Sequence, residues 1–433
     1  MPFKLGHMHR KVLKFWGAAA AFCLVIIAIS LISRTGKTSS ASEPQNTVEV
    51  ENEYEISKDT LALQLGTAIR ANEFPARYTM EIEGEKQPVQ VDYTLHEPTQ
   101  AAMQKLMNQY QPDYGAFVAM DAKTGRILSM VSYSREHSGL DNLALRATFP
   151  AASIFKVVTA SAAIDMQKAA PDTIVPFNGA NHTLYKKNVE STQVTRWTRK
   201  MTMKEAFGRS VNVFFGKLGL FYVGPQNLLM YAERFLFNHP IRADVPVQTG
   251  YAKISPDDPW SVVTAASGFT RDNTMSPLHG ALIAAAVAND GVMMEPYVVN
   301  KLTSAEGEAL YEGHPRQASV VVEPQSAEEL RKLFKQTVVS GTSRKSFRQI
   351  VRGPKYDEVE FGGKTGSLTG ADPQGKCDWF VGYARYRDQR IAVAALTVNE
   401  KKWRVKSSML ANLYFQRYLK EIKMEEHVAS NSR

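Results

Sequence analysis

A serine and a lysine stand three residues apart at the start of a mostly apolar segment, in Ser153-Ile154-Phe155-Lys156. The apolar residues that continue to position 163 predict a helix buried on most sides, with Ser153 in its first turn and Lys156 on the same face. A serine hydroxyl is a poor nucleophile unless a base lies beside it, and a lysine whose ammonium form is destabilised can be that base. The helix N-terminus would add positive potential where an oxyanion forms. On its own the pattern is more typical of a helix cap with a surface lysine.

A second group of polar residues is Ser210-Val211-Asn212. Thr202 and Glu205 form a capping-box pattern that begins a short helix, and Gly208 ends it before the next apolar run. The serine and the asparagine are therefore expected at a tight turn between two helices, where their side chains can point into a cleft. Because serine and asparagine are also common turn residues, this group alone is more typical of turn chemistry.

The third group is Lys364-Thr365-Gly366-Ser367, which follows Gly362-Gly363 in a strand-like segment. Glycine inside a strand indicates that something approaches the backbone closely, and a strand edge bared in this way can pair with an extended peptide. A lysine at such an edge would bind a substrate carboxylate or raise the local positive potential. A phosphate-binding loop is excluded because Glu358 stands where its first glycine should be, and no helix is expected to follow.

The segments around these groups predict strands near both ends of the region and helices between them. Apolar strand-like runs at 115–121 and 126–132 flank a hairpin turn, and the middle of the chain is mainly helical. One sheet is therefore expected from N- and C-terminal pieces, with a helical insertion packed beside it. The expected helices are 57–71, 99–109, 153–167, 203–207, 211–222, 278–289 and 406–423, and the further expected strands are 77–83, 89–95, 359–368, 378–385 and 390–398.

In this order and context, the three groups resemble the motifs of the penicillin-binding protein and serine β-lactamase superfamily. The resemblance covers about residues 99–423 and includes the hairpin at 115–132, the stretch 275–296 and residues 378–384. It implies an α/β (α+β) fold, in which an antiparallel five-stranded sheet is flanked by helices and accompanied by an all-helical subdomain. The region looks closest to the transpeptidase domain of bifunctional cell-wall synthases. Because only residues 1–98 precede it, we do not expect their glycosyltransferase domain, and we expect the large pedestal of monofunctional family members to be absent or reduced to residues 51–98.

The sequence departs from the family pattern at two places. The family commonly has Pro-Gly-Ser before the nucleophile, whereas this chain has Pro150-Ala151-Ala152-Ser153, so the turn must form without glycine. Ser367 stands where threonine is common, which keeps a hydroxyl group. Neither change removes a reacting group.

The resemblance implies a role for each residue of the three motifs. Ser153 would attack the carbonyl of a D-alanyl-D-alanine stem peptide after Lys156, kept neutral by burial and by the charge of Lys364, takes its proton. Backbone N–H groups of Ser153 and Ser367 would hold the oxyanion, and an acceptor amine would then form the crosslink. β-Lactams would acylate Ser153 because they mimic the substrate. The implied catalytic residues are Ser153, Lys156 and Ser210, and the implied substrate-binding residues are Asn212, Lys364, Thr365, Gly366 and Ser367.

Residues 15–33 form a run of 19 residues without a charged side chain. As a helix this run would span roughly 28 Å, close to a bilayer core of about 30 Å. Lys4, Arg10, Lys11 and Lys14 precede it, which predicts a cytoplasmic segment 1–14, a single-pass signal anchor in the inner membrane and a periplasmic catalytic domain. A cleaved signal peptide is the alternative. We expect a stalk and a small lead-in element over 34–98 and a flexible tail over 424–433.

The three motifs are also compatible with other functions within and beyond the family. A D,D-carboxypeptidase would use water as the acceptor, and a class-D-like β-lactamase would need rapid hydrolysis of the acyl-enzyme; residues 233–238 fit a helix end better than a deacylation site. A β-lactam sensor needs an output domain that 14 cytoplasmic residues do not offer. A non-catalytic cell-wall scaffold is disfavoured by the intact motifs.

Composition limits the partners that the sequence predicts. The net charge is +9 without a dense basic block, so we expect no nucleic-acid partner. Cys23 and Cys377 are not expected to pair, and no metal-binding motif is present, so neither a metal nor another cofactor is predicted. The expected partners are stem peptides, β-lactams, the membrane and, as an open question, a separate glycosyltransferase.

Overall fold

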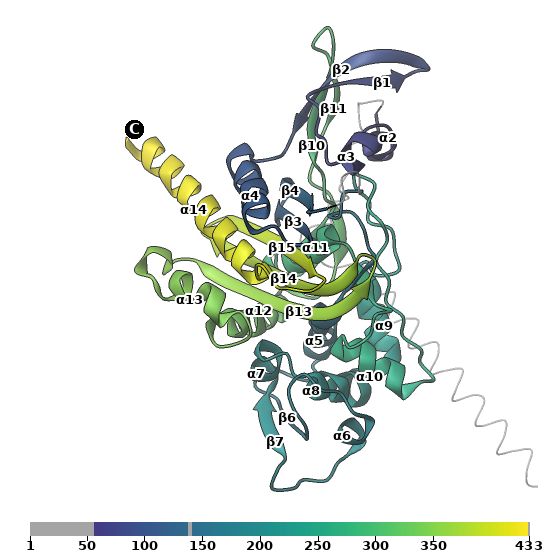
Figure 1. The fold of residues 1–433 in the computed structure, drawn as a ribbon, viewed down its shortest axis with the longest axis vertical. Coiled ribbons are helices and arrows are strands. Elements are labelled where there is room, and N and C mark those ends of the chain that lie inside the picture. The colour runs from purple at the N-terminus through teal and green to yellow at the C-terminus, as the bar shows by residue number, and fades with distance from the viewer. Residues whose placement is uncertain (1–55, 137–140, 432–433) are drawn as a thin grey trace, which may run out of the picture. The chain divides into compact units, whose positions relative to one another are not determined.

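A five-stranded antiparallel sheet forms the centre of the fold (Figure 1). The structure is a computed structural model that describes residues 56–136 and 141–431. The strand order is β13-β14-β15-β3-β4, so the N-terminal hairpin lies beside the last C-terminal strand, and β13 forms one edge. This arrangement confirms the predicted sheet. Its strands are β3 (Tyr114–Asp121), β4 (Ile127–Ser134), β13 (Glu360–Ala371), β14 (Gln374–Tyr386) and β15 (Gln389–Asn399).

Both faces of the sheet are covered, which explains why its strands are apolar without an obvious alternation. In β3, Ala116, Val118 and Met120 belong to one hydrophobic core, and Phe117 and Ala119 belong to the other. Because successive side chains of a strand point to opposite faces, two cores require apolar residues at every position.

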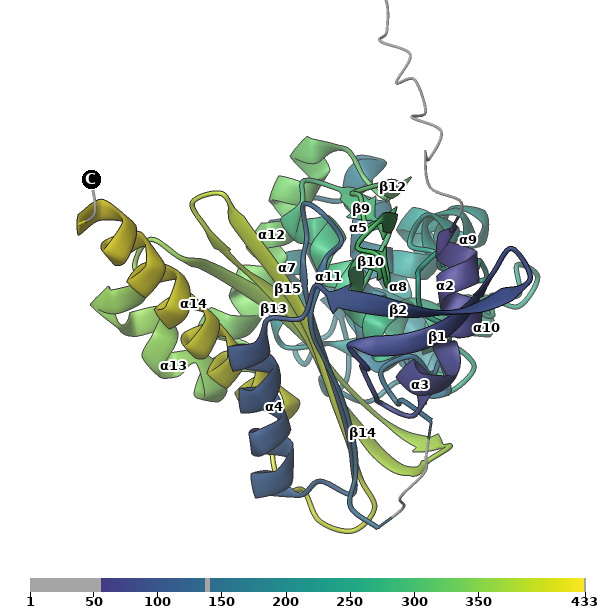
Figure 2. The same cartoon turned by 90° about the horizontal axis from the view of Figure 1, so that it is seen from above.

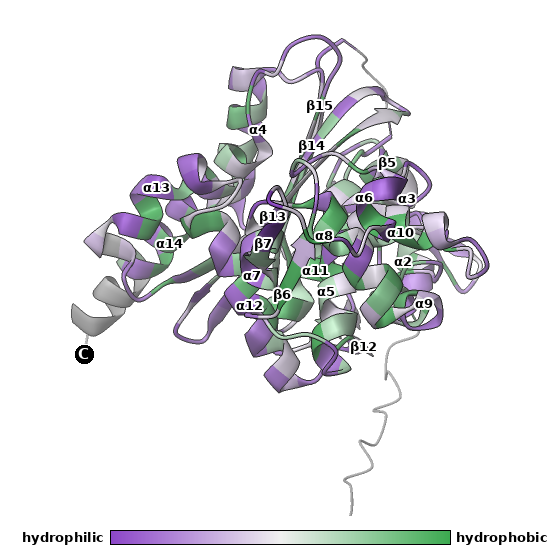
Figure 3. Cartoon of the chain, turned by 90° about the horizontal axis from the view of Figure 1, so that it is seen from below, coloured by the Kyte–Doolittle hydropathy of each residue, from purple (hydrophilic) through white to green (hydrophobic). Residues whose placement is uncertain are grey.

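Different helices form the two cores (Figure 2). The helix α11 (Pro277–Ala288) covers one face, and every one of its residues is buried. On the other face lie α4 (Glu97–Tyr110) and α14 (Ser407–Asn431), with α13 (Arg344–Arg352) packed against α14. In α13 only Phe347 and Ile350 are buried, and Figure 3 accordingly shows hydrophilic residues over much of this helix.

A largely helical subdomain lies beside the sheet, at the bottom of Figure 1. It is not entirely helical as the sequence suggested, because β6 (Ile174–Phe177) and β7 (Arg199–Thr202) pair within it. These strands have four residues each, too few for a periodic pattern to reveal them. The helices are α5 (Lys156–Asp165), α6 (Lys186–Glu190), α7 (Met203–Gly208), α8 (Asn212–Lys217), the π-helical η2 (Leu218–Val223), α9 (Pro225–Arg234) and α10 (Pro259–Ser267), with α12 (Pro324–Val339) adjoining them.

The lead-in element shares a second sheet with strands from much later in the chain. It comprises α2 (Lys58–Gln64), α3 (Gly66–Arg70), β1 (Arg77–Ile82) and β2 (Glu85–Tyr93), and β2 pairs with β10 (Val299–Ser304), which in turn pairs with β11 (Ala309–Glu312). A buried ion pair of 2.9 Å between Lys58 Nζ and Glu295 Oε2 adds a second link. The lead-in element is therefore packed into the same structural unit as the motifs.

Two short strand pairs and a 3-10 turn complete the described chain. β5 (Phe149–Pro150) pairs with β8 (Thr274–Met275), and β9 (Val292–Met294) pairs with β12 (Gln317–Val320), while η3 (Pro354–Tyr356) precedes β13. The closing helix α14 continues to Asn431, farther than the helix expected to end at 423. The predicted anchor at 15–33 lies outside the described residues, and within the described ranges no helix has both the length and the apolar character to cross a bilayer.

Candidate active site

Ser153 lies in a short 3-10 helix, η1 (Ala152–Phe155), that leads directly into α5. The sequence predicted Ser153 in the first turn of an α-helix, whereas in the structure this turn is a 3-10 helix and the α-helix begins at Lys156. Lys156 is the first residue of α5, and its Nζ lies 2.7 Å from Ser153 Oγ. Ala152 has a φ of 48°, in the left-handed region that glycine adopts without strain. Ala152 therefore adopts the left-handed backbone conformation that favours glycine, although the chain lacks the glycine that is common before the nucleophile in the family.

Lys156 is fully buried, and three oxygen atoms surround its amine. In addition to Ser153 Oγ, Nζ contacts Asn212 Oδ1 at 2.8 Å and the carbonyl oxygen of Ser267 through a very short hydrogen bond. Burial, and then the charge of Lys364, hold the pKa of Lys156 well below its usual value. A neutral amine has two N–H groups for Asn212 and Ser267, which leaves its lone pair facing the hydroxyl of Ser153.

Ser210 lies in the turn between α7 and α8, as predicted. The capping box of Thr202 and Glu205 is present at the start of α7, which ends at Gly208. Ser210 itself has a φ of 55° and is buried, and its Oγ accepts a hydrogen bond of 2.9 Å from Lys364 Nζ. The turn thus connects the second motif to the third.

Asn212 is held by two residues that the sequence did not single out. Its backbone N–H donates to Asn181 O at 2.7 Å, and its Nδ2 donates to His182 O at 3.0 Å. These bonds leave Oδ1 directed at Lys156. The His182 side chain also hydrogen-bonds the Ser210 backbone, and its pKa is lowered first by burial and then by the charges of Lys156 and Lys364. No sequence signal marks this loop, because it acts mainly through carbonyl groups that any residue supplies.

The third motif lies on the edge strand β13. Lys364 is fully buried, and its Nζ donates to Thr365 O at 2.8 Å as well as to Ser210. Burial lowers the pKa of Lys364 to about 7. Thr365 is half-buried and Ser367 is exposed. A Cβ at Gly366 would lie 3.2 Å from Ile154 Cγ1, so this glycine lets the strand approach η1 closely.

The two preceding glycines have a different role from the one that the sequence suggested. A Cβ at Gly362 would lie 2.7 Å from the Tyr383 ring, and one at Gly363 would lie 2.2 Å from the Phe380 ring. The groups that approach the backbone are thus aromatic side chains of the neighbouring strand β14, whose bulk fills the core.

The loop that carries Ser153 is braced by residues outside all three motifs. Ala151 N donates to Asn273 O at 2.7 Å, and Trp379 Nε1 donates to Pro150 O at 2.9 Å. Gly268, with a φ of 63°, packs so closely that a Cβ there would lie 1.9 Å from Ala152 O. Trp379 is also fully buried, so it combines core packing with a hydrogen bond to this loop.

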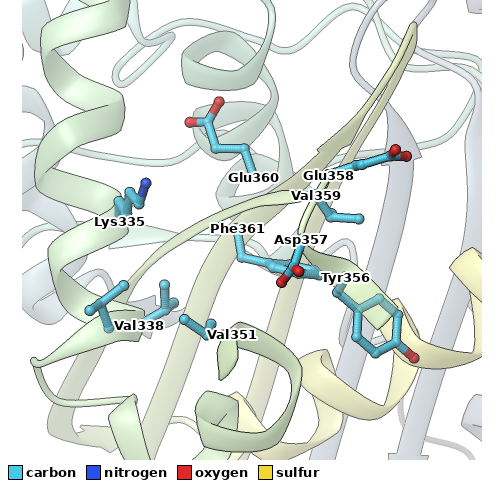
Figure 4. A pocket seen from close by; sticks show the side chains of 10 residues that line it. Lys335, Val338, Val351, Tyr356, Asp357, Glu358, Val359, Glu360 and Phe361 are labelled. Carbon is cyan, nitrogen blue, oxygen red and sulfur yellow. The ribbon is translucent and has the colours of Figure 1, made fainter. Parts of the chain in front are cut away.

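A separate cavity of about 310 Å³ lies where α12, α13 and the start of β13 meet (Figure 4). Phe361, Val338 and Val351 form apolar walls, and Asp357 and Glu358 add acidic groups. None of the predicted site residues lines this cavity. Across the described ranges, no group of three or more histidine, cysteine, aspartate or glutamate side chains could hold a metal ion.

The central sheet, its helical layers and the serine and lysine beside its edge define the architecture of a penicillin-binding transpeptidase domain. Residues 115–419 match the family model described as the penicillin binding protein transpeptidase domain. The chain belongs to this family, which confirms the resemblance inferred from the motifs.

Individual relatives support the same assignment. The chain is 28% identical over 342 residues to peptidoglycan D,D-transpeptidase PbpA of Mycolicibacterium smegmatis, which covers 71% of this chain and 66% of the relative. It is also similar to the crystal structure of PBPA from Mycobacterium tuberculosis, with a TM-score of 0.62, 25% identity and coverage of 78% of this chain and 82% of that chain. A penicillin G acyl-enzyme complex of penicillin-binding protein A from the same organism gives a TM-score of 0.60 at 26% identity, over 76% and 80% of the two chains. The chain spans about two thirds of the length of the curated relatives.

Proposed function

We propose that this protein is a membrane-anchored serine D,D-transpeptidase that crosslinks peptidoglycan stem peptides through an acyl-enzyme on Ser153 and binds β-lactams covalently. The observation that carries the proposal is the environment of the Lys156 amine. Its Nζ lies at hydrogen-bond distance from Asn212 Oδ1, from the carbonyl oxygen of Ser267 and, at 2.7 Å, from Ser153 Oγ. In the neutral amine, the first two oxygens accept its two N–H groups and its lone pair faces Ser153 Oγ. This is the arrangement of a nucleophile with its general base.

The reaction begins when Ser153 Oγ attacks the carbonyl carbon of the penultimate D-alanine and Lys156 Nζ takes the hydroxyl proton. Ser210 then relays that proton from Lys156 to the nitrogen of the leaving D-alanine as the peptide bond breaks, so that Lys156 is neutral again. Lys364, which contacts Ser210 at 2.9 Å, places positive charge beside this relay. Together with Thr365 and Ser367, it binds the terminal carboxylate of the stem peptide. Backbone N–H groups of Ser153 and Ser367 stabilise the oxyanion, each donor contributing roughly 10²–10³ in rate. An acceptor amine finally attacks the ester carbonyl, and one of its protons passes through Lys156 to Ser153 Oγ as the new amide bond forms and the ester bond breaks.

The hydrogen-bond partners of the reacting groups favour an amine acceptor over a β-lactamase function. Among the described residues, no carboxylate hydrogen-bonds to Ser153 or Lys156, so neither contact supplies a base for a hydrolytic water. Glu233, considered as such a base from the sequence, lies in the last turn of α9. Incubation with polymerised lipid-linked peptidoglycan precursor tests the choice. Crosslinked dimers support a transpeptidase, whereas released D-alanine without crosslinks identifies a carboxypeptidase.

The proposed function also includes where the protein acts in the cell. Residues 15–33 anchor the chain in the bacterial inner membrane, and the domain described here acts in the periplasm, where stem peptides are found. A glycan strand must exist before its peptides can be crosslinked, so a separate glycosyltransferase is the expected partner. Fractionation of cells that produce the full chain tests the anchor, because recovery only in the soluble periplasmic fraction would contradict it.

Changing Ser153 to alanine should abolish covalent labelling by a fluorescent penicillin. The reason is that Oγ forms the ester bond, and no other hydroxyl lies at hydrogen-bond distance from Lys156 Nζ in the described chain. Gel fluorescence measures the labelling, and thermal unfolding shows whether the variant is folded. Stoichiometric labelling of a folded Ser153→Ala protein would refute the assignment of the nucleophile.

The affinity for substrate carboxylates should decrease as the pH rises through about 7, the value to which burial lowers the pKa of Lys364. Below this pH the ammonium attracts the carboxylate, and above it the neutral amine does not. The free energy of unfolding should instead increase as the pH rises from about 7 to about 10. Over this range Lys364 binds more protons in the unfolded chain, where its pKa is higher, than in the folded one. Pre-steady-state acylation by a penicillin between pH 6 and 9 measures the affinity. An affinity that is independent of pH would contradict the role of Lys364.

A further inference from the structure

One loop outside the three motifs connects two of them. It joins α12 to α13 and contains Gly341, Thr342 and Ser343. The backbone N–H of Thr342 donates to Gly208 O at 2.9 Å, two residues before Ser210. Its hydroxyl lies 2.5 Å from Thr365 Oγ1, in the third motif. The second and third motifs are thus linked through a single residue.

The position of Thr342 is fixed by its neighbours. Gly341 packs against Gly208 so closely that a Cβ would lie 2.2 Å from Gly208 O. On the other side, Ser343 is buried, and its Oγ donates to Thr337 O at 3.1 Å within α12. The loop therefore holds Thr342 rigidly, although the residue itself is exposed beside the strand edge.

The partner of the Thr342 hydroxyl is equally well fixed. Thr365 pairs with Phe380 in the sheet, and its carbonyl accepts the hydrogen bond from Lys364 Nζ. Either hydroxyl of the pair can act as the donor. A hydroxyl has one proton, so Thr365 can donate to an anion only if it accepts from Thr342 at the same time. When Thr342 donates to Thr365 and Thr365 donates to the anion, the first hydrogen bond also polarises the Thr365 hydroxyl and strengthens the second.

We propose that Thr342 is a positioning residue of the carboxylate subsite, and that it donates to Thr365 so that the Thr365 hydroxyl donates to the terminal carboxylate of the substrate or β-lactam. This inference rests on the proposed function, which assigns carboxylate binding to Thr365. The role requires the hydroxyl of Thr342 but not its methyl group. Thr342 should therefore affect the binding of ligands with a free carboxylate, and not of ligands in which that carboxylate is esterified.

The test compares Thr342→Val, Thr342→Ala and Thr342→Ser with the unchanged full chain. Acylation is followed with a penicillin and with its methyl ester, and the non-covalent affinity is separated from the acylation rate constant. For the free acid we expect valine and alanine to weaken affinity roughly tenfold, as for the loss of one hydrogen bond near a charged group. The acylation rate constant should be unchanged, serine should restore the affinity, and the ester should react equally with every variant.

A double-mutant cycle shows whether Thr342 acts by positioning Thr365 or by contacting the ligand itself. Because Thr342 acts through Thr365, Thr342→Val should have little further effect on affinity in a Thr365→Val background. Additive losses, equal losses for acid and ester, or an unchanged affinity of Thr342→Val for the acid would each overturn the proposal. A wild-type protein that acylates with neither compound would contradict the proposed function itself, and this role of Thr342 would fail with it.

Discussion

Changing Lys156 to methionine should reduce the acylation rate constant for a β-lactam by about 10²–10⁴-fold, the range expected when a general base is lost. Methionine has a similar length and apolar stem, so it fills the buried space of Lys156, but its sulfur is not basic enough to take the proton of Ser153. The non-covalent affinity should change much less, because carboxylate binding depends on Lys364 and Thr365 in the proposed function. Stopped-flow acylation with a chromogenic cephalosporin separates the two parameters.

Lys217 provides a matched control for this substitution. It also has a mostly buried side chain and a pKa lowered by burial, but its Nζ donates to Ser191 O, outside the motifs. Lys217→Met should acylate at nearly the wild-type rate. Lys156→Arg should remain inactive, because a guanidinium keeps its proton and cannot act as the base. If folded Lys156→Met acylated at a rate close to that of the wild type, Lys156 would not be the base.

Apart from Gly366, the site residues predicted from the sequence share one property, which is that their side chains perform the proposed chemistry. Local patterns also fixed where some of them lie. The capping box at Thr202 and Glu205 placed the turn of Ser210, and the apolar run after Ser153 placed Lys156 one turn away. Short-range rules were sufficient here because the first motif lies at the start of a helix and the second in the turn between two helices.

The groups that position the site could not be predicted in the same way. Ser267 contacts Lys156 through a carbonyl, and Asn181 and His182 hold Asn212 through theirs. Since every residue has a carbonyl group, residue type gives no signal for such contacts. Thr342 was missed for a related reason, because the packing of α12 against β13, which are not adjacent in the sequence, places it beside Thr365.

The glycines of β13 show how a correct local observation led to an incomplete interpretation. Gly362 and Gly363 do mark a close approach to the backbone, but Tyr383 and Phe380 make it. The sequence rule detects the missing side chain and not the identity of the neighbour. Distinguishing a ligand from a core aromatic requires the register of β13 against β14, which pairs Gly362 with Tyr383.

Changing Gly268 to alanine should both destabilise the protein and slow acylation. The backbone at Gly268 has a φ of 63°, which costs an L-residue about 1–2 kcal/mol. The new Cβ would also lie 1.9 Å from Ala152 O and 3.0 Å from Ser153 Cα, and such overpacking typically costs about 1–3 kcal/mol. Relief of this clash must move the carbonyl of Ala152 and the nucleophile with it. A displacement near 1 Å can reduce the rate by about 10²-fold.

Two other glycines separate the backbone effect from the steric one. Gly84 and Gly307 have φ values of 83° and 90°, and a Cβ at either would meet no atom within 4 Å. Gly84→Ala and Gly307→Ala should therefore lower stability by the backbone cost alone and leave acylation unchanged. Chemical denaturation and penicillin acylation of the three variants measure both quantities. Equal destabilisation of all three, with wild-type acylation by Gly268→Ala, would show that the contact with Ala152 does not position Ser153.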